Sequence, residues 1–324
     1  MKRKIIVTGG TGFVGGALLT RLVARGDRDV LAWIRRVDSN LPVGVVPVVP
    51  VVPSFNRIFA AGSPVENLDV VVHCAARVHV MSDTAIDPLG EFRKVNVDLT
   101  LELARGAVAA GAKRFIFLST VKVNGESSGP GLAFKDGDTP QPMDPYAVSK
   151  LEAERELRSL AEDTGLEVVI IRVPLVYGPG VKGNFRSMMR WLSTGLPLPL
   201  GGLNNKRSLV ALGNLVDLID TCIAHPAAAN QTLMVCDGED LSISELLRRL
   251  AAALGRPARL LAIPGGWLAM AARLLGREDV HARLCGSLQV DMSKTQELLG
   301  WAPPVRVDDA LGETARDYLY QSRS

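Results

Sequence analysis

Short apolar runs alternate with segments of helical periodicity through the first half of the chain. An apolar run at residues 4–8 leads through glycines into residues 13–25, where leucines recur at helical spacing. Similar apolar runs cover 29–36, 69–76, 113–120 and 167–178, and helical patterns cover 93–111 and the residues from 144 onward. Such alternation predicts a parallel sheet covered by helices on both faces, because each crossover helix packs on one face. The predicted fold class is therefore α/β, with a doubly wound parallel sheet.

The alternation breaks down in the second half of the chain. Loops rich in glycine and proline there separate shorter helical patterns, of which 241–255 is the clearest. We expect a first domain at residues 1–175, with 207–225 returning to it, and a smaller mixed α/β domain at 176–324. The segment VVPVVPVVP, residues 45–53, has a proline at every third position, which excludes a central strand. It predicts an edge strand or an extended loop.

Composition and charge exclude several classes of protein. The chain has 324 residues, 47% of them hydrophobic, and a formal net charge of +3 without a basic block, so we expect no nucleic-acid partner. Four cysteines without a CxxC pair fit reduced thiols in a cytoplasmic protein rather than disulfides or a metal site. The longest apolar region, 260–275, is interrupted by proline, glycine and arginine, so we expect no membrane span.

The sequence TGGTGFVG, residues 8–15, follows the first strand and opens the first helix. Its Gly9, Gly12 and Gly15 are three residues apart. Glycines let a backbone approach a pyrophosphate closely, and a helix N-terminus supplies free N–H groups and the positive end of a dipole. A glycine-rich turn without a ligand is the alternative. The strand, turn and helix context favours a dinucleotide site over that alternative.

The end of the second strand should distinguish NAD from NADP. An acidic residue there would bind the ribose hydroxyls of NAD, but Arg35 and Arg36 occupy this place, and an arginine accommodates a 2′-phosphate. We therefore prefer NADP(H) over NAD(H), with Asp38 as the alternative acid after a shift of register. The segment HCAARVHV follows a buried strand, and its small residues Ala75 and Ala76 would let the backbone lie beside the cofactor.

A second motif pairs a phenol with an ammonium group. Tyr146 and Lys150 are four residues apart in a predicted helix, so both side chains rise from one face. An ammonium group one turn away favours a phenolate, and Tyr146 could then exchange a proton with an alcohol while a nicotinamide exchanges the hydride. Ser119 and Thr120 end a predicted central strand, where parallel sheets bind ligands. A surface tyrosine beside a solvated lysine is the alternative.

These three motifs together resemble those of the extended short-chain dehydrogenases/reductases, the epimerase/dehydratase group that acts on nucleotide sugars. The resemblance extends over nearly the whole chain. It implies a Rossmann fold in which Tyr146 is the general acid/base and Lys150 lowers its pKa and binds the nicotinamide ribose. It also implies that Thr120 is the catalytic hydroxyl, with Ser119 as its neighbour and substitute.

The same resemblance implies what the second domain binds and how two copies of the chain would assemble. Residues 176–324 would bind a UDP-sugar, and the helices that begin near Phe92 and Tyr146 would form a homodimer interface. His73 and His79 are more often structural than catalytic in this context. The expected cofactor-binding residues are Gly9, Gly12, Phe13, Val14, Gly15, Arg35, Arg36, Ala75, Ala76 and Lys150, and the expected substrate-binding residues are Asn184, Arg207 and Arg283.

The residues after Thr120 narrow the expected reaction. Sugar 4,6-dehydratases of this group have an Asp-Glu pair there, whereas this chain has Val121 and Lys122. A 4-epimerase with tightly bound NAD and a 4-keto reductase remain. The arginines after the second strand favour the reductase, and the segments HCAARVHVM and STVKVNGE are similar to enzymes that reduce UDP-4-keto-6-deoxy-N-acetylhexosamine to UDP-N-acetylquinovosamine for surface polysaccharide (O-antigen) synthesis. A dinucleotide sensor without activity and a reductase of a non-sugar ketone are further alternatives.

Overall fold

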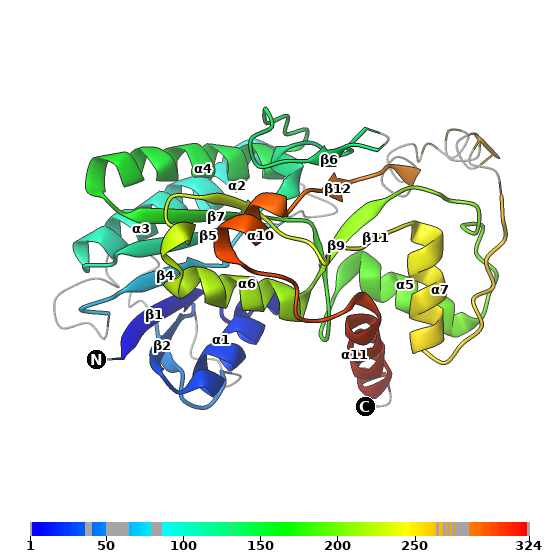
Figure 1. Cartoon of the computed structure of the whole chain (residues 1–324), viewed down its shortest axis with the longest axis horizontal. Helices are drawn as coiled ribbons and strands as arrows, with labels where there is room; N and C mark the ends of the chain where they lie inside the picture. The colour runs from blue at the N-terminus through cyan, green and yellow to red at the C-terminus, as the bar shows by residue number, and fades with distance from the viewer. Residues whose placement is uncertain are drawn as a thin grey trace.

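A seven-stranded parallel sheet forms the centre of the described part of the computed structural model (Figure 1). The order reverses at β1, whose neighbours are β2 and β4, and such a reversal opens a ligand crevice at the carboxyl ends of the strands. The strand order is β10-β7-β5-β4-β1-β2-β3, with bounds β1 Arg3–Thr8, β2 Arg28–Trp33, β3 Val46–Val48, β4 Val70–His73, β5 Arg114–Thr120, β7 Glu167–Val173 and β10 Thr232–Met234. The structure describes residues 2–35, 41–49, 65–78, 86–129, 131–263, 266–267, 270, 273, 276 and 285–322.

Helices cover both faces of this sheet, as Figure 1 shows. On one face, α1 (Phe13–Arg25) and α6 (Leu212–Ala224) share a core with Ile5 and Val7 of β1. On the other face, α3 (Leu99–Ala109) and α4 (Pro145–Thr164) share a core that includes Ile6, the residue between Ile5 and Val7 on β1. The alternation follows from the strand pleat, which points successive side chains to opposite faces. The predicted doubly wound, Rossmann-type α/β fold is confirmed.

The helix predicted at 93–111 begins earlier than its apolar pattern indicates. It starts with α2 (Pro88–Arg93), continues through a π-helical turn, η2 (Lys94–Asp98), and runs into α3. Asp87 caps this start, because its side chain accepts a hydrogen bond from the backbone N–H of Gly90 at 2.9 Å. Proline at the first helical position is compatible with a helix start, since that N–H needs no intrahelical partner.

Two segments from the second half of the chain join the layers around the central sheet. Strand β10 extends it by pairing with β7, and α6 packs against α1. The C-terminal end of α6 is held by Arg114, which donates to the carbonyl oxygens of Cys222 (2.6 Å) and His225 (2.9 Å). A guanidinium group at this end satisfies the last carbonyls and the negative end of the helix dipole.

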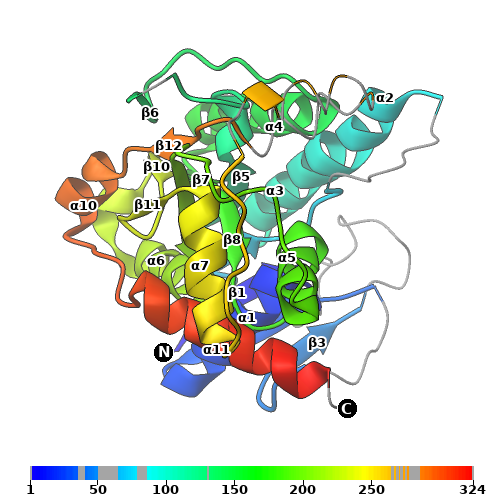
Figure 2. The same ribbon diagram turned by 90° about the vertical axis from the view of Figure 1, so that its right-hand side faces the viewer.

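A third core lies beside the central sheet and is built by the C-terminal half of the chain. It gathers α5, α7 and α11 around a small sheet of order β11-β9-β8, and Figure 2 shows the three helices side by side. Further described elements are a two-stranded sheet of β6 and β12, the 3-10 turns η3 and η4, and helix α10. The bounds are η3 Val121–Val123, β6 Ala133–Phe134, β8 Leu175–Tyr177, α5 Gly183–Thr194, β9 Arg207–Ala211, η4 Pro226–Ala228, β11 Asp240–Leu241, α7 Ile243–Ala253, β12 Gln289–Val290, α10 Ser293–Leu299 and α11 Val307–Gln321.

The proline-rich segment provides the edge strand that its spacing predicts. Strand β3 pairs with β2 at the edge of the described sheet, with Pro47 opposite Ala32. Proline has no backbone N–H to donate to a ladder, so an edge strand is the place where it is tolerated. Residues 50–53 of this segment lie outside the described residues.

Candidate active site

The loop between β1 and α1 is packed so tightly that Gly9 and Gly15 have no room for side chains. Gly9 has a φ of +69°, and a Cβ on it would lie 2.8 Å from the backbone nitrogen of Ala75. A Cβ on Gly15 would lie 2.2 Å from the carbonyl oxygen of Gly9. Gly12 is the N-cap of α1 and supplies no side-chain cap, so the first N–H groups of the helix can bind an anion. These residues fit the pyrophosphate of a dinucleotide.

The segment after β4 lies directly against this loop. The backbone N–H of Ala75 donates to Thr8 Oγ1 at 3.2 Å, and the side chains of Ala75 and Ala76 are half-buried. Phe13 and Val14, in the first turn of α1, are also half-buried and pack against the core beneath the loop. Small residues after β4 therefore border the loop where the sequence predicts a cofactor.

His73, at the end of β4, is a structural residue. Its Nδ1 lies 2.7 Å from Thr8 Oγ1, and its Nε2 lies 3.0 Å from Thr100 Oγ1. Burial, followed by the charge of Lys150, lowers the pKa of His73 to about 3. The ring is therefore neutral at physiological pH and joins β4 to β1 and α3. His79 lies outside the described residues.

The residues expected to select the cofactor are only partly described. Ile34 follows β2 and is buried, with its N–H donating to the carbonyl of Val48 at 3.1 Å. Arg35 is exposed, whereas Arg36 and Asp38 lie outside the described residues. The described end of β2 thus carries a basic side chain at the place where an acid would bind the ribose of NAD.

Tyr146 and Lys150 both lie on α4, one turn apart. The helix begins at Pro145, and its N-cap Asp144 accepts a hydrogen bond from the backbone N–H of Ala147 at 2.7 Å. Lys150 is 2% exposed, and its Nζ lies 3.9 Å from the centre of the Phe117 ring on β5. Tyr146 is half-buried, with its ring packed edge-on against that of Phe92 at 6.1 Å. The sequence spacing therefore places both groups on one helix, with Lys150 packed over β5.

Burial opposes the charged form of both groups. It lowers the pKa of Lys150 to about 7, although Glu154 and Cys74 act in the opposite direction. It raises the pKa of Tyr146 to about 12, and the Asp144 carboxylate adds to this rise. Desolvation and Asp144 thus set the direction of this shift, and the lowering of the Tyr146 pKa by Lys150 stays a prediction. The phenol is protonated at neutral pH and is suited to donating a proton.

Ser119 and Thr120 end β5, and their hydroxyl groups have different environments. Ser119 is buried and donates to the Glu154 carboxylate at 2.6 Å. Thr120 caps the following 3-10 turn, where its Oγ1 accepts from the backbone N–H of Lys122 at 3.3 Å, so its own proton can be donated elsewhere. This difference favours Thr120 as the hydroxyl that contacts a substrate.

The expected substrate-binding residues are separated along the second half of the chain. Asn184 is exposed in the first turn of α5. Arg207 begins β9, is half-buried, and donates from Nη1 to the carbonyl of Gly286 at 3.0 Å. Burial lowers the pKa of Arg207, while Glu126 opposes this effect. Arg283 lies outside the described residues.

Sequence reasoning missed two buried charges beside the motif. Glu154 and Arg172 form a two-pronged ion pair, with Arg172 Nη2 2.7 Å from Glu154 Oε2 and Arg172 Nε 3.0 Å from Oε1. They are 0% and 2% exposed, respectively. The only signal in the sequence is the position of Glu154 four residues after Lys150, which places it on the same face of α4.

Lys122 fills the place where sugar dehydratases have an acid. Its ammonium group donates to Glu126 and Asp144, both at 2.8 Å. Burial would lower the pKa of Lys122, but these two hydrogen bonds outweigh burial and raise it. Lys122 is therefore a cation that partly neutralises Asp144, the N-cap next to Tyr146.

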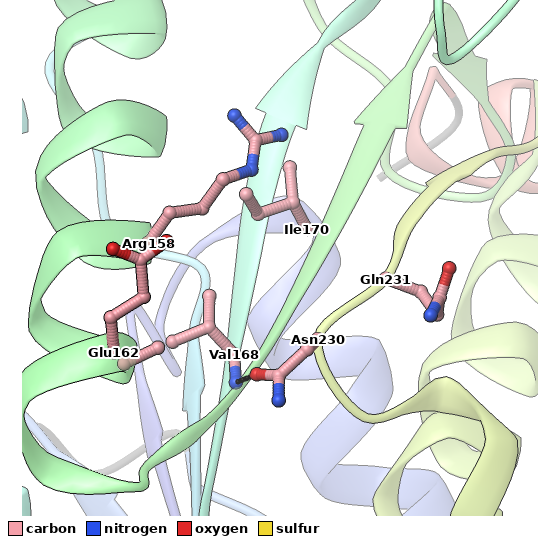
Figure 3. A pocket seen from close by; sticks show the side chains of 7 residues that line it. Arg158, Glu162, Val168, Ile170, Asn230 and Gln231 are labelled. Atoms are coloured by element: carbon pink, nitrogen blue, oxygen red, sulfur yellow. Dashed lines mark hydrogen bonds between the residues drawn. The ribbon is translucent and has the colours of Figure 1, made fainter.

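A cavity of about 250 Å³ has none of Tyr146, Lys150, Ser119 and Thr120 among its lining residues (Figure 3). It is lined by the later turns of α4, the first half of β7 and residues 230–231, where Asn230 accepts the backbone N–H of Val168 at 3.0 Å. In the described part of the chain, no three His, Cys, Asp or Glu side chains are grouped to hold a metal ion. None of the described helices is long and apolar enough to cross a membrane.

Comparisons with known proteins relate this geometry to a family. Residues 5–236 match the family model described as NAD dependent epimerase/dehydratase family. A Vibrio cholerae protein described as UDP-glucose 4-epimerase is 47% identical over 98% of this chain and 96% of its own length. The UDP-glucuronic acid 4-epimerase from Bacillus cereus in complex with NAD is 20% identical, with a TM-score of 0.77 and 98% of both chains covered. RMD from Pseudomonas aeruginosa complexed with NADPH is 21% identical, with a TM-score of 0.73 and 98% and 99% covered.

Proposed function

Because the chain belongs to the NAD dependent epimerase/dehydratase family, we propose that it is a 4-epimerase of a UDP-hexose or UDP-N-acetylhexosamine. The observation that carries this proposal is the 47% identity, over nearly the full length of both chains, to a protein described as UDP-glucose 4-epimerase. The 4-keto reductase, which the sequence motifs favoured, becomes the second candidate for the same reason.

The dinucleotide would lie along the carboxyl ends of β1 and β4. Gly9, Gly12 and Gly15 leave space for its pyrophosphate, and the uncapped N-terminus of α1 supplies N–H donors. Ala75 borders the same loop, and Lys150 would bind the nicotinamide ribose. When bound, NAD supplies the acceptor and donor of the hydride at carbon 4 of the sugar.

Tyr146 would move the proton at the sugar O4, with Thr120 holding the same oxygen. A phenol with a pKa raised to about 12 keeps its proton at neutral pH, so it can give that proton to O4 as the C4 carbonyl is reduced. Lys150 adds a positive charge on the same face of α4. In an epimerase Tyr146 would take the O4 proton while C4 is oxidised and return it when C4 is reduced from the opposite face. The oxidising half-reaction therefore needs the phenolate, which a protonated Lys150 would favour.

The second half of the chain would hold the UDP-sugar. We assign residues 1–175, with 207–225, to cofactor binding and 176–324 to substrate binding. Arg207 is a half-buried cation suited to a diphosphate, and Asn184 and Arg283 would complete the site. We further propose a homodimer whose interface uses α2 and α4, the helices that carry Phe92 and Tyr146.

One observation favours the second candidate, the reduction of UDP-4-keto-6-deoxy-N-acetylhexosamine to UDP-N-acetylquinovosamine. Ile34 and Arg35 follow β2 where an acid would bind NAD, and an exposed arginine there suits the 2′-phosphate of NADPH. Net reduction consumes one NADPH for each sugar, whereas epimerisation returns the hydride and consumes none.

The two candidates are separated by the nucleotide and by cofactor turnover. Nucleotide released by heating the purified protein is identified by mass and absorbance, and stripped protein is titrated with NADH and NADPH. Bound NAD and interconversion of UDP-glucose with UDP-galactose, or of their N-acetyl forms, without added cofactor would support the epimerase. Stoichiometric NADPH oxidation with the 4-keto sugar, without epimerisation, would establish the reductase instead. Tyr146→Phe should abolish either activity, whereas Tyr320→Phe, the same change at an exposed tyrosine, should not.

A further inference from the structure

Glu154 continues the face of α4 that carries Tyr146 and Lys150. The three residues follow each other at intervals of four, so they rise one turn apart from one side of the helix. Glu154 is fully buried, and its carboxylate accepts from Ser119 Oγ at 2.6 Å as well as from Arg172. The buried Glu154 carboxylate, one turn beyond Lys150 on α4, is thus hydrogen-bonded to Ser119, the residue before Thr120.

Arg172 extends this contact across the sheet. It lies on β7 in register with Ser119 on β5, and its Nη1 donates to Asn124 Oδ1 at 3.1 Å. The same Nη1 donates to the carbonyl of Asp136 at 3.3 Å. The chain of hydrogen bonds therefore ties α4 to β5, β7 and the loop that follows Thr120.

The surroundings of Lys150 leave Glu154 as its main buried counter-charge in the described part of the chain. On β5 the ammonium faces the Phe117 ring, and on β4 and its following loop it faces a neutral His73 and Cys74. The pKa of Cys74 is raised to about 12, so this thiol carries no charge at neutral pH. Of the groups that oppose the loss of the Lys150 proton, Glu154 has the largest effect.

We propose that Glu154 is a positioning residue for the reaction: it holds Ser119, and with it Thr120, against the helix of Tyr146, and its charge favours the ammonium form of Lys150. This inference rests on the proposed roles of Tyr146, Lys150 and Thr120. A buried ion pair that only joins α4 to β7 is the competing explanation, and it predicts effects on stability alone.

The network reaches solvent at Arg158, whose Nη2 lies 3.5 Å from Glu154 Oε2 and 2.6 Å from Thr232 Oγ1. Arg158 lines the cavity of Figure 3, and its side chain is 43% exposed. An exposed, longer contact of this kind contributes little. Arg158→Ala therefore serves as a control that touches Glu154 without removing its charge.

The electrostatic part of the proposal is tested on Lys150 itself, without substrate. Protein labelled with ¹³C-lysine is titrated by NMR, with the Lys150 ε-carbon signal assigned from Lys150→Met. Glu154→Gln should lower the pH at which Lys150 titrates by about one unit or more, and the falling high-pH limb of kcat should move with it. Glu152→Gln removes a partly exposed carboxylate of the same helix that pairs with Arg93. This variant and Arg158→Ala should leave both properties unchanged.

One further variant keeps the test decisive if Glu154→Gln does not fold. The double variant Glu154→Met, Arg172→Met replaces the buried pair with apolar side chains of similar size, a change that proteins often tolerate. It should shift the Lys150 titration in the same direction but by less, because the Arg172 cation is removed together with the carboxylate. A Lys150 signal that titrates as in the unaltered protein would overturn the electrostatic role.

The geometric part is tested with Ser119→Ala, which leaves the ion pair in place. We expect kcat to fall roughly 10-fold or more with little change in KM, because small displacements of a catalytic group are costly. Unchanged kcat would overturn this part. A Lys150 shift in a protein that acts on no UDP-sugar would keep the inference for Glu154 and reject the proposed function instead.

Discussion

Replacing Gly15 with alanine tests how closely the first helix packs against the glycine loop. A Cβ at this position would lie 2.2 Å from the oxygen and 2.7 Å from the carbon of the Gly9 carbonyl, and 3.1 Å from Gly10 Cα. All three are backbone atoms, so no side chain can turn away. Restoring an ordinary contact of 3.4 Å to the Gly9 oxygen requires the helix and loop to separate by about 1.2 Å.

Gly16 provides the matched control, because it is the next residue of the same helix. A Cβ there would lie 3.3 Å from the Gly10 oxygen, which a small shift relieves. Both substitutions gain roughly 0.5–1 kcal/mol of helix propensity. Overpacking costs about 1–3 kcal/mol, and the rigid contact puts Gly15→Ala at the upper end of that range. We expect Gly15→Ala to be less stable than Gly16→Ala by about 2–3 kcal/mol.

Urea unfolding measures this difference directly, and calorimetric titration measures the effect on nucleotide binding. A displacement of the loop on this scale should weaken dinucleotide affinity by roughly 10-fold or more in Gly15→Ala. Gly16→Ala should bind as the unaltered protein does. Equal stability and equal affinity of the two variants would refute both the close packing of the loop and its role as the cofactor site.

Two further predictions concern titrating groups. The pKa of buried His73 is about 3, below its ordinary value of 6.5, so the unfolded chain takes up the proton first as the pH falls. The unfolding free energy should therefore decrease by about 1.4 kcal/mol per pH unit between pH 6.5 and about 3. Denaturation at several pH values should show a shallower dependence in His73→Gln, and equal slopes would contradict the prediction. Asp144→Asn keeps an N-cap side chain on α4 but removes the charge that raises the pKa of Tyr146. The pKa of Tyr146 in Asp144→Asn is measured by ultraviolet titration, with the double variant Asp144→Asn, Tyr146→Phe subtracted as the reference. It should lie below about 12, and an unchanged pKa would exclude the influence of Asp144.

Local patterns identified the elements and the chemistry of the candidate site. The period of apolar residues predicted the strands and helices, because it reports which faces are buried. The glycine spacing predicted the loop between β1 and α1, where a Cβ would meet backbone. The four-residue interval placed Tyr146 and Lys150 on one helix, since that interval is a turn of any α-helix. These properties depend on residues that are close in sequence.

The protonation states and the partner of Ser119 depend on the tertiary structure. Whether Lys150 is an ammonium ion or Tyr146 a phenolate depends on how far each is removed from water, and the sequence interval carries no information on burial. Glu154 and Arg172 meet only because α4 packs on β5 and β7, which bring together residues from distant parts of the chain. The sequence by itself thus determined which groups are available for catalysis. The packing of α4 on the sheet decided which of them are charged and which hydroxyl is left for a substrate.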